Sequence, residues 1–251
     1  MIPYFTSTQI PLGHITIQTW GLFVALGFIA GAFASIWLAK QRGLKSAVVW
    51  DVLGWIIFSS MIGARLFHIV FYEPTYYLAN PLEILAVWHG GMSMVGGLIG
   101  AAVAGVGYLR YKKLDLLKHV DVLVFGLPLG YFIGRIGCFL IHDHPGIPTS
   151  FFLGVQYPDG IIRHDLGLYH SLLGLAIFIF FLIIKKKAPV GSFLIWFLIL
   201  YGVARFFFDF LRINDVRFLA LTPAQYFGIL MALGGGLLYF RLRDKRFSRD
   251  S

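Results

Sequence analysis

Residues 134–146 read GRIGCFLIHDHPG and place four polar side chains inside an apolar part of the chain. Arg135 lies within the run, and His142, Asp143 and His144 follow it closely. A permanent charge is costly inside an apolar segment and is usually kept where it faces a protected cavity. Arginine also forms bidentate hydrogen bonds to phosphate. The stretch therefore predicts an anion site close to groups that exchange protons.

The composition of the whole chain is that of a membrane protein. Of its 251 residues, 58% are hydrophobic and only 13% are charged, whereas soluble domains carry about a quarter charged residues. The net charge of +9 fits nucleic-acid binding in principle, but the basic residues form short clusters between apolar runs. We therefore predict an all-α integral membrane protein with no nucleic-acid partner. Residues 1–251 are expected to form a single polytopic domain.

About seven apolar segments have the length expected of transmembrane helices. They lie at about 16–39, 47–72, 84–110, 119–141, 166–184, 190–212 and 222–240. Basic residues are concentrated in alternate connections and in the C-terminal tail, and the positive-inside rule places these parts in the cytoplasm. The N-terminus is then outside, the C-terminus is cytoplasmic, and the connection at about 142–165 is an outer-face loop. Because residues 1–14 hold no Lys or Arg, we expect no cleaved signal peptide.

Three arginines are predicted at similar depth in the outer half of the membrane. Arg65, Arg135 and Arg205 each lie in a different expected span, towards its outer end. A cluster of guanidinium groups at that depth favours an anionic phospholipid headgroup as its partner. The alternative is that arginines near helix ends extend to the membrane surface without a further role. Arg212 and Arg217 fit either interpretation.

The sixth expected span carries its polar residues at helical spacing. Tyr201, Arg205, Asp209 and Arg212 follow one another at i, i+4, i+8 and i+11, which places them on one helical face. Asp209 can therefore pair with Arg205 or Arg212 and hold a guanidinium in place. The alternative is a purely structural ladder of ion pairs.

The third expected span begins with HGGMSMVGGLIG, residues 89–100. Its paired glycines weaken a helix and permit close approach of another backbone. Gly96 and Gly100 have the spacing of a helix–helix contact. Gly96 and Gly97 are therefore expected to support a site, either by lining a cavity or by packing alone.

These segments together resemble the prolipoprotein diacylglyceryl transferase family of bacterial inner membranes. The family's signature reads roughly G-R-x-G-N-F-x-N-x-E-x-x-G, with Asp143 here in place of its Glu. Its other matches are Gly134, Arg135, Gly137, Phe139 and Gly146. The resemblance covers nearly the whole chain and includes the segments GARLFHIVFY, GGMS, GGLIG and YGVARFFFDFLR.

The resemblance implies a lipid transfer reaction at the outer face of the bacterial plasma membrane. The family moves the diacylglyceryl group of phosphatidylglycerol to the lipobox cysteine thiol of a prolipoprotein and releases glycerol phosphate. The expected partners are phosphatidylglycerol, prolipoprotein signal peptides and the bilayer, without a cofactor. Arg135 and Arg205 are expected to bind the phosphate and stabilise its charge. The resemblance adds Arg65, Tyr201 and Gly146 to the phosphatidylglycerol site, with Asp209, Arg212, Gly96 and Gly97 in support.

Several positions differ from the family pattern. The substituted positions are Trp20 for Tyr, Val95 for His or Tyr, Cys138 and Ile141 for Asn, and His170 for Glu. The phosphate-binding parts therefore match better than the parts linked to proton transfer. This difference leaves a second hypothesis open, a catalytically weak paralogue that binds anionic phospholipid or escorts lipoproteins.

Nearby histidines offer a replacement for the missing proton acceptor. A neutral imidazole can act as a general base near neutral pH. The candidates are His142 and His144 beside Asp143, together with His89 and His170. Each of them is equally compatible with a solvated or structural role.

Two further chemistries are weaker alternatives. Cys138 lies one turn after Arg135 and could act as a nucleophile, although buried cysteines usually behave as small hydrophobes. A metal-dependent hydrolase would use His142, Asp143, His144, His164 and Asp165. Their spacing matches no recognised metal motif, so we predict no metal.

Overall fold

The computed structural model describes residues 1–13, 15–86, 90–213 and 217–250, and most of them are helical. Contacts divide the chain into two compact units. The larger unit joins Met1–Leu38 to Val120–Ser251, and the smaller unit is Ala39–His119. The single domain therefore stays a prediction, whereas the largely helical fold class is confirmed.

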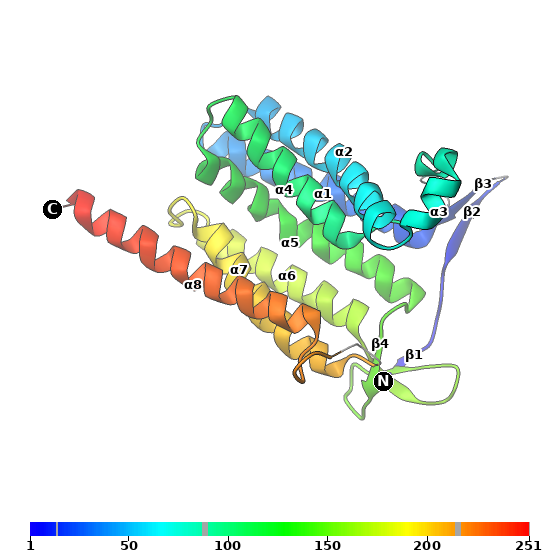
Figure 1. The fold of residues 1–251 in the computed structure, drawn as a ribbon. Coiled ribbons are helices and arrows are strands. Elements are labelled where there is room, and N and C mark those ends of the chain that lie inside the picture. The colour runs from blue at the N-terminus through cyan, green and yellow to red at the C-terminus, as the bar shows by residue number, and fades with distance from the viewer. Residues whose placement is uncertain (14, 87–89, 214–216, 251) are drawn as a thin grey trace. The chain divides into compact units, whose positions relative to one another are not determined.

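The larger unit is built from long apolar helices (Figure 1). They are α1 (Thr19–Gln41), α5 (Leu116–Ile141), α6 (Leu166–Ile184), α7 (Ser192–Phe208) and α8 (Pro223–Asp250). Small residues let these helices touch through their backbones: a Cβ on Gly27 would lie 2.5 Å from the Gly130 oxygen. Gly202 of α7 and Gly228 of α8 make an equivalent contact, so α7 and α8 run side by side. Such packing is typical of helices in membranes.

The smaller unit contains the pair α2 (Ser46–Phe71) and α4 (Met94–Tyr111). The short helix α3 (Pro74–Ala79) and the 3₁₀ turn η1 (Pro81–Ile84) lie between them in the chain. The expected span at 84–110 starts too early, because the described residues before Met94 are not α-helical. Gly90 and Gly91 take φ values of +87° and +70°, which a right-handed helix does not allow.

Gly96 and Gly100 make the close helix contact that their spacing predicts. A Cβ on Gly96 would lie 2.2 Å from the Gly63 oxygen, and one on Gly100 would lie 2.2 Å from the Ser59 oxygen. Gly97 is different, because its nearest neighbours would be at ordinary contact distances of 3.5 and 3.6 Å. Of the adjacent glycines Gly96 and Gly97, only Gly96 is therefore required by helix packing.

Short strands add to the helices, so "all-α" describes the fold incompletely. The strands are β1 (Ile2–Pro3), β2 (Gln9–Leu12), β3 (Ile15–Gln18), β4 (Pro145–Pro148), β5 (Val155–Gln156) and β6 (Ile162–Asp165). One sheet has the order β1-β5-β6-β4, and β2 and β3 form a hairpin. The expected loop at 142–165 is therefore partly a sheet, and the N-terminal β1 completes it.

Five helices of the described residues are long and apolar enough to cross a membrane. They are Thr19–Gln41, Ser46–Phe71, Leu116–Ile141, Leu166–Ile184 and Ser192–Leu211. The remaining two of the seven expected spans correspond to α4 and α8. This finding supports a helical membrane protein, and the full span count stays a prediction.

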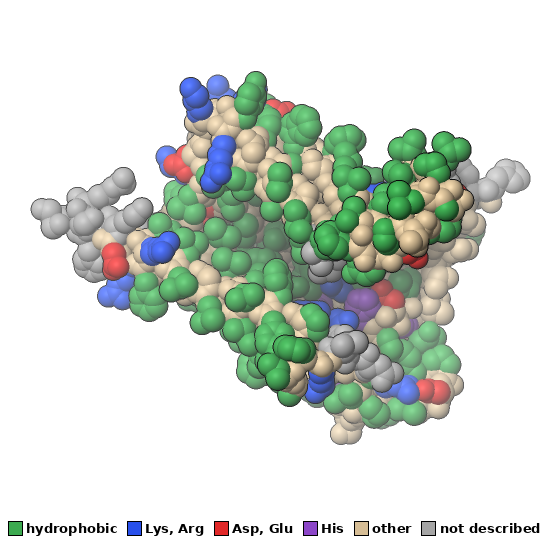
Figure 2. Space-filling view, in the orientation of Figure 1, with side chains coloured by type: hydrophobic (Ala, Val, Ile, Leu, Met, Phe, Trp, Pro, Cys, Tyr) green, Lys and Arg blue, Asp and Glu red, His purple; other side chains and the backbone are tan. Residues whose placement is uncertain are grey.

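The outward side of α8 is apolar, as a bilayer-facing helix requires (Figure 2). Leu230, Leu233, Leu237 and Phe240 follow one helical face and are each at least 60% exposed. Water would not favour such a stripe, whereas lipid chains cover it without cost.

Candidate functional site

The larger unit brings two of the predicted arginines around one buried histidine. Arg205 of α7 donates from Nη1 to Nε2 of His170 in α6, at 3.0 Å. Arg135 of α5 stacks on the Tyr131 ring, with its guanidinium carbon 5.1 Å from the ring centre. The Tyr131 ring in turn lies edge-on to His170 and to Tyr201, with centroids 6.0 and 5.4 Å away. We call these five residues the arginine cluster.

Tyr131 belongs to this cluster although the sequence analysis did not name it. It lies four residues before Arg135 in α5, so the two side chains share a helix face. A tyrosine ring offers a cation–π surface that holds a guanidinium without occupying its N–H donors. The i, i+4 spacing was the available signal.

His170 orients Arg205, which argues against its role as a base. A histidine nitrogen that accepts a hydrogen bond from a guanidinium carries a lone pair, so the proton lies on Nδ1. His170 is fully buried. Protonation of Nε2 would break the bond to Arg205 and place two cations side by side. His170 is therefore suited to positioning Arg205 rather than to accepting a proton.

Asp209 holds the other side of Arg205. Its Oδ1 lies 3.4 Å from Nη2 of Arg205 and 3.2 Å from Nε of Arg212, as the spacing predicted. Its Oδ2 accepts a hydrogen bond from the hydroxyl of Thr222, just before α8. Asp209 is 1% exposed, and a buried carboxylate of this kind requires such partners. Arg205 is thus fixed from two directions.

The four polar residues of this segment do not share one continuous helix. The α-helix ends at Phe208, a 3₁₀ turn covers Asp209–Leu211, and Arg212 is extended. The backbone of Arg212 instead pairs with that of Gly146. A Cβ on Gly146 would lie 2.7 Å from the Leu211 oxygen, so glycine permits this pairing. Gly146 therefore has a packing role in the described structure, and its expected lipid contact stays a prediction.

The end of α5 places three possible metal ligands together. Cys138 lies in its last turn, and Asp143 and His144 follow the helix. The ligand atoms of these three residues all lie within 4.8 Å of one another. Asp143 Oδ1 and His144 Nδ1 are 3.0 Å apart, and Cys138 Sγ is 3.9 Å from Nη1 of Arg135. Two of its members, Asp143 and His144, belong to the set expected for a metal hydrolase, whereas Cys138 does not.

His142 is buried rather than solvated. Its Nδ1 lies 2.6 Å from Oδ2 of Asp165, and both side chains are at most 1% exposed. The Tyr4 ring stacks on it at 4.7 Å. Tyr157 also donates to Asp165, and burial followed by this carboxylate raises the pKa of Tyr157. His142 therefore ties the chain after α5 to β6, and a catalytic role for it stays a prediction.

Two histidines expected at a hydrolase metal site, His142 and His164, contact different partners. His164 Nδ1 contacts the Tyr169 hydroxyl at 2.6 Å, away from the His142–Asp165 pair. Burial lowers the pKa of His164.

Among the residues considered for proton transfer, His89 lies outside the described residues. Val95, which replaces the His or Tyr of the family pattern, lies in the first turn of α4.

Arg65 is buried in the smaller unit and is bound to backbone carbonyls. Its Nε donates to Ile84, and its two terminal nitrogens donate to the carbonyls around it. The acceptors of Nη1 are Gly90 and Gly91, and those of Nη2 are Glu83 and Ala86. A guanidinium has five N–H donors, so this arrangement uses all of them. Arg65 thus holds the segment between α3 and α4, and its expected place beside a phosphate stays a prediction.

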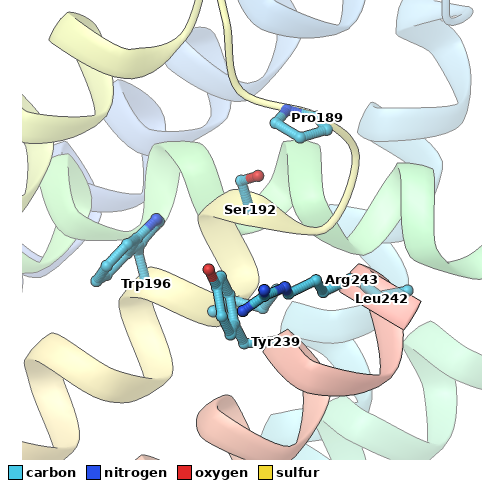
Figure 3. A pocket seen from close by; sticks show the side chains of 7 residues that line it. Pro189, Ser192, Trp196, Tyr239, Leu242 and Arg243 are labelled. Carbon is cyan, nitrogen blue, oxygen red and sulfur yellow. The ribbon is translucent and has the colours of Figure 1, made fainter. Parts of the chain in front are cut away.

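A pocket of about 410 Å³ lies at the opposite end of α7 from Arg205. Tyr239 and Arg243 of α8 lie next to one another on one side of it, facing Ser192 and Trp196 (Figure 3). It contains no residue of the arginine cluster. The candidate site therefore rests on side-chain geometry.

Long apolar helices with a cluster of held arginines are typical of a membrane protein, and the arginine cluster is a candidate anion site. The sequence profile of the prolipoprotein diacylglyceryl transferase family matches residues 7–241. The chain belongs to this family. It is 35% identical to the phosphatidylglycerol–prolipoprotein diacylglyceryl transferase of Nitrosomonas europaea, over 96% of this chain and 91% of that protein. It is 34% identical to the protein of the same name from Geobacter sulfurreducens, over 92% and 91%.

Proposed function

We propose that the chain transfers the diacylglyceryl group of phosphatidylglycerol to the lipobox cysteine thiol of prolipoproteins and releases glycerol phosphate. The names of its relatives state this donor, acceptor and group. The structural observation that supports the proposal, and that suggests where the site lies, is the arginine cluster. Arg205 donates to His170, and Arg135 stacks on the Tyr131 ring that lies edge-on to the same histidine, so each is held by groups that leave part of its guanidinium available.

The two arginines are suited to stabilise a leaving phosphate. In the described part of the chain no carboxylate pairs with Arg135, so its positive charge is not neutralised there. Arg205 keeps further N–H donors beyond those directed to His170 and Asp209. Preorganised donors of this kind lower the free energy of a developing negative charge. Tyr201 borders the same space through its contact with Tyr131.

We further propose seven spans, formed by the five helices that are long and apolar enough to cross a membrane together with α4 and α8. The N-terminus then lies outside, the C-terminus lies in the cytoplasm, and the arginine cluster faces the outer side of the bacterial plasma membrane. The placement of the basic residues supports this orientation. Labelling of single cysteines introduced in the 185–187 segment tests it, because only an impermeant reagent added inside should reach them.

The deciding experiment uses purified protein in liposomes with phosphatidylglycerol and a synthetic lipobox peptide. Mass spectrometry of the peptide follows its gain of a diacylglyceryl group. A gain that requires both phosphatidylglycerol and the peptide cysteine establishes the transferase. A peptide with the cysteine replaced by serine is the matched control. Phosphatidylglycerol binding without any gain would instead establish the lipid-binding paralogue.

A further inference from the structure

We propose that Cys138, Asp143 and His144 bind a zinc-like divalent cation, and that this cation coordinates and deprotonates the acceptor thiol. The inference rests on the proposed transferase function and departs from the prediction that no metal is used. Neither the family signature nor the spacing of these residues suggested it. The observation behind it is that three different ligand types converge after α5.

The donor set fits a borderline-soft metal. Thiolate, carboxylate and imidazole are the three ligand types that zinc uses, and here their ligand atoms all lie within 4.8 Å of one another. Three protein ligands leave one position of a tetrahedral ion open. An open position is the feature that separates catalytic zinc sites from structural ones.

The backbone that carries these ligands is held in place. The helix α5 ends at Ile141, and His142 turns the chain with a φ of +50°. This turn returns Asp143 and His144 towards Cys138 in the last turn of the helix. The bond from His142 to Asp165 fixes the reversal. Ligands that are already held in position favour metal binding, and this backbone geometry preorganises Asp143 and His144.

The start of α6 provides a second anchor. The amide of Leu166 donates to the carbonyl oxygen of His144, at 3.1 Å. A Cβ on Gly167 would lie 2.8 Å from the Phe139 nitrogen, so α6 approaches α5 closely beside Cys138. His144 is thus tied to the same two helices that carry the arginine cluster.

The site contains two ligands that are anionic when they bind a metal, with one cation beside them. Nη1 of Arg135 lies 3.9 Å from Cys138 Sγ. The thiolate and the Asp143 carboxylate together neutralise a divalent ion. The guanidinium of Arg135 then keeps its positive charge for the phosphate. Metal and arginine would therefore act on the two partners of one reaction, the thiol and the leaving group.

The metal site offers a way for the acceptor thiol to lose its proton. The acceptor cysteine must lose its proton, because the thiolate is the nucleophile. His170 accepts a hydrogen bond from Arg205 at Nε2, whereas His142 pairs with Asp165 through Nδ1 and has no hydrogen-bond partner at Nε2 among the described residues. A thiol that coordinates zinc is deprotonated without a separate base.

The transfer step balances with this arrangement. On coordination the thiol S–H bond breaks, sulfur binds the metal, and the proton leaves to water. The sulfur then forms a bond to the glyceryl carbon while the bond from that carbon to the phosphate oxygen breaks. The electron pair stays on the oxygen, and glycerol phosphate leaves beside Arg135. The thioether formed is neutral and binds the metal weakly, so the product can depart.

Metal binding is tested first, separately from activity. Untagged protein in detergent is stripped with a chelator, equilibrated with Zn²⁺ and analysed for metal content. Cd²⁺ binding, followed by thiolate-to-metal charge-transfer absorption, reports Cys138 directly. We expect about one ion per chain, as for a single site. Cys138→Asn and His144→Ala should each weaken binding by at least about 100-fold, since even outer partners of a ligand contribute 10–100-fold.

His164→Ala is the matched control, because it removes a histidine of the same segment outside the ligand group. It should bind the metal like the parent. Cys138→Asn must keep the melting temperature of the stripped parent for its loss of binding to count, and His144→Ala provides a second variant. Zinc that binds equally to the parent and to both ligand variants would overturn the site.

Activity with lipobox peptide then tests the role of the metal. We expect chelation to lower the transfer rate and Zn²⁺ to restore it in the parent, with no restoration in Cys138→Asn. Transfer that continues at the full rate in chelator would overturn the catalytic role while the transferase function stands. Metal binding through Cys138 without transfer under any condition would overturn the proposed function instead.

Discussion

Arg65 and Arg135 are both arginines of expected spans, but they differ in what holds the guanidinium. Arg65 lies 4% exposed among backbone carbonyls that take all five of its N–H donors. Arg135 is half-buried and stacks on the ring of Tyr131, with its guanidinium carbon 5.1 Å from the ring centre. All N–H donors of Arg65 are used in hydrogen bonds to the backbone, whereas Arg135 keeps donors that could bind an anion.

The surroundings of the two residues explain this difference. Around Arg65, glycines with positive φ turn the carbonyls of one segment inward, and the arginine neutralises their partial charges. Around Arg135 and Arg205, aromatic rings, one histidine and one carboxylate fix the side chains from behind. Burial of a charge therefore does not indicate function by itself, whereas the chemistry of its partners does.

Removal of Arg135 or Arg205 should have the largest effect on transfer. Loss of one preorganised donor to a developing charge lowers a rate by about 10²–10³-fold. We expect Arg135→Ala and Arg205→Ala to lower kcat/KM for the lipobox peptide by that factor. Arg163→Ala is the control, because Arg163 pairs with Asp159 at 2.6 Å outside the cluster. A rate within threefold of the parent for either cluster variant would contradict the assignment.

Removal of Arg65 should affect stability instead of transfer. Arg65→Met leaves the carbonyls of the 83–91 segment without their donors, at a cost of roughly 1–3 kcal/mol in the free energy of unfolding. We expect a lower melting temperature in detergent and a nearly unchanged rate per folded molecule. Unchanged melting with lost phosphatidylglycerol binding would return Arg65 to the phosphate site.

Substitutions of two adjacent glycines in α4, Gly96 and Gly97, test how tightly the smaller unit is packed. Gly96→Ala would place a Cβ 2.2 Å from the Gly63 oxygen, and overpacking of this kind costs about 1–3 kcal/mol. Gly97→Ala would meet only ordinary contacts, and alanine favours a helix by about 1 kcal/mol over glycine. We expect the first variant to melt lower than the parent and the second to melt at the same temperature or higher. Equal melting of the two would show that the helix contact is looser than described.

Parts of this structure could be predicted from the sequence because they depend on local pattern. The apolar runs located the long helices, and the i+4 spacing from Arg205 to Asp209 located their ion pair. The sheet was missed, since it joins strands of two to four residues and pairs Ile2 with Val155. The partners of Arg65 were also missed, because residue types do not show which way a loop turns its carbonyls. The approach of His144 to within 4.8 Å of Cys138 was likewise missed, because it follows a turn with one positive φ, at His142.

The ion pair between Arg163 and the exposed Asp159 completes the comparison and should show the smallest effect. Asp159 accepts hydrogen bonds from the Ile161 amide and from Arg163, which together lower its pKa. Its folded pKa is therefore below its unfolded pKa, so the stabilisation is present above about pH 3.9 and is lost as pH falls through the folded value. We expect Asp159→Asn to melt slightly below the parent near neutral pH.

The two proteins should then converge in acid, and added salt should narrow the difference because solvent screens an exposed pair. The measurement is the melting temperature of both across pH at low and high salt. A difference that persists below the folded pKa would mean that the Asp159 side chain acts through its shape and hydrogen bonds rather than its charge. Arg163 would then resemble Arg65, a guanidinium that stabilises the fold through its hydrogen bonds, and the partners of an arginine rather than its exposure would again indicate its role.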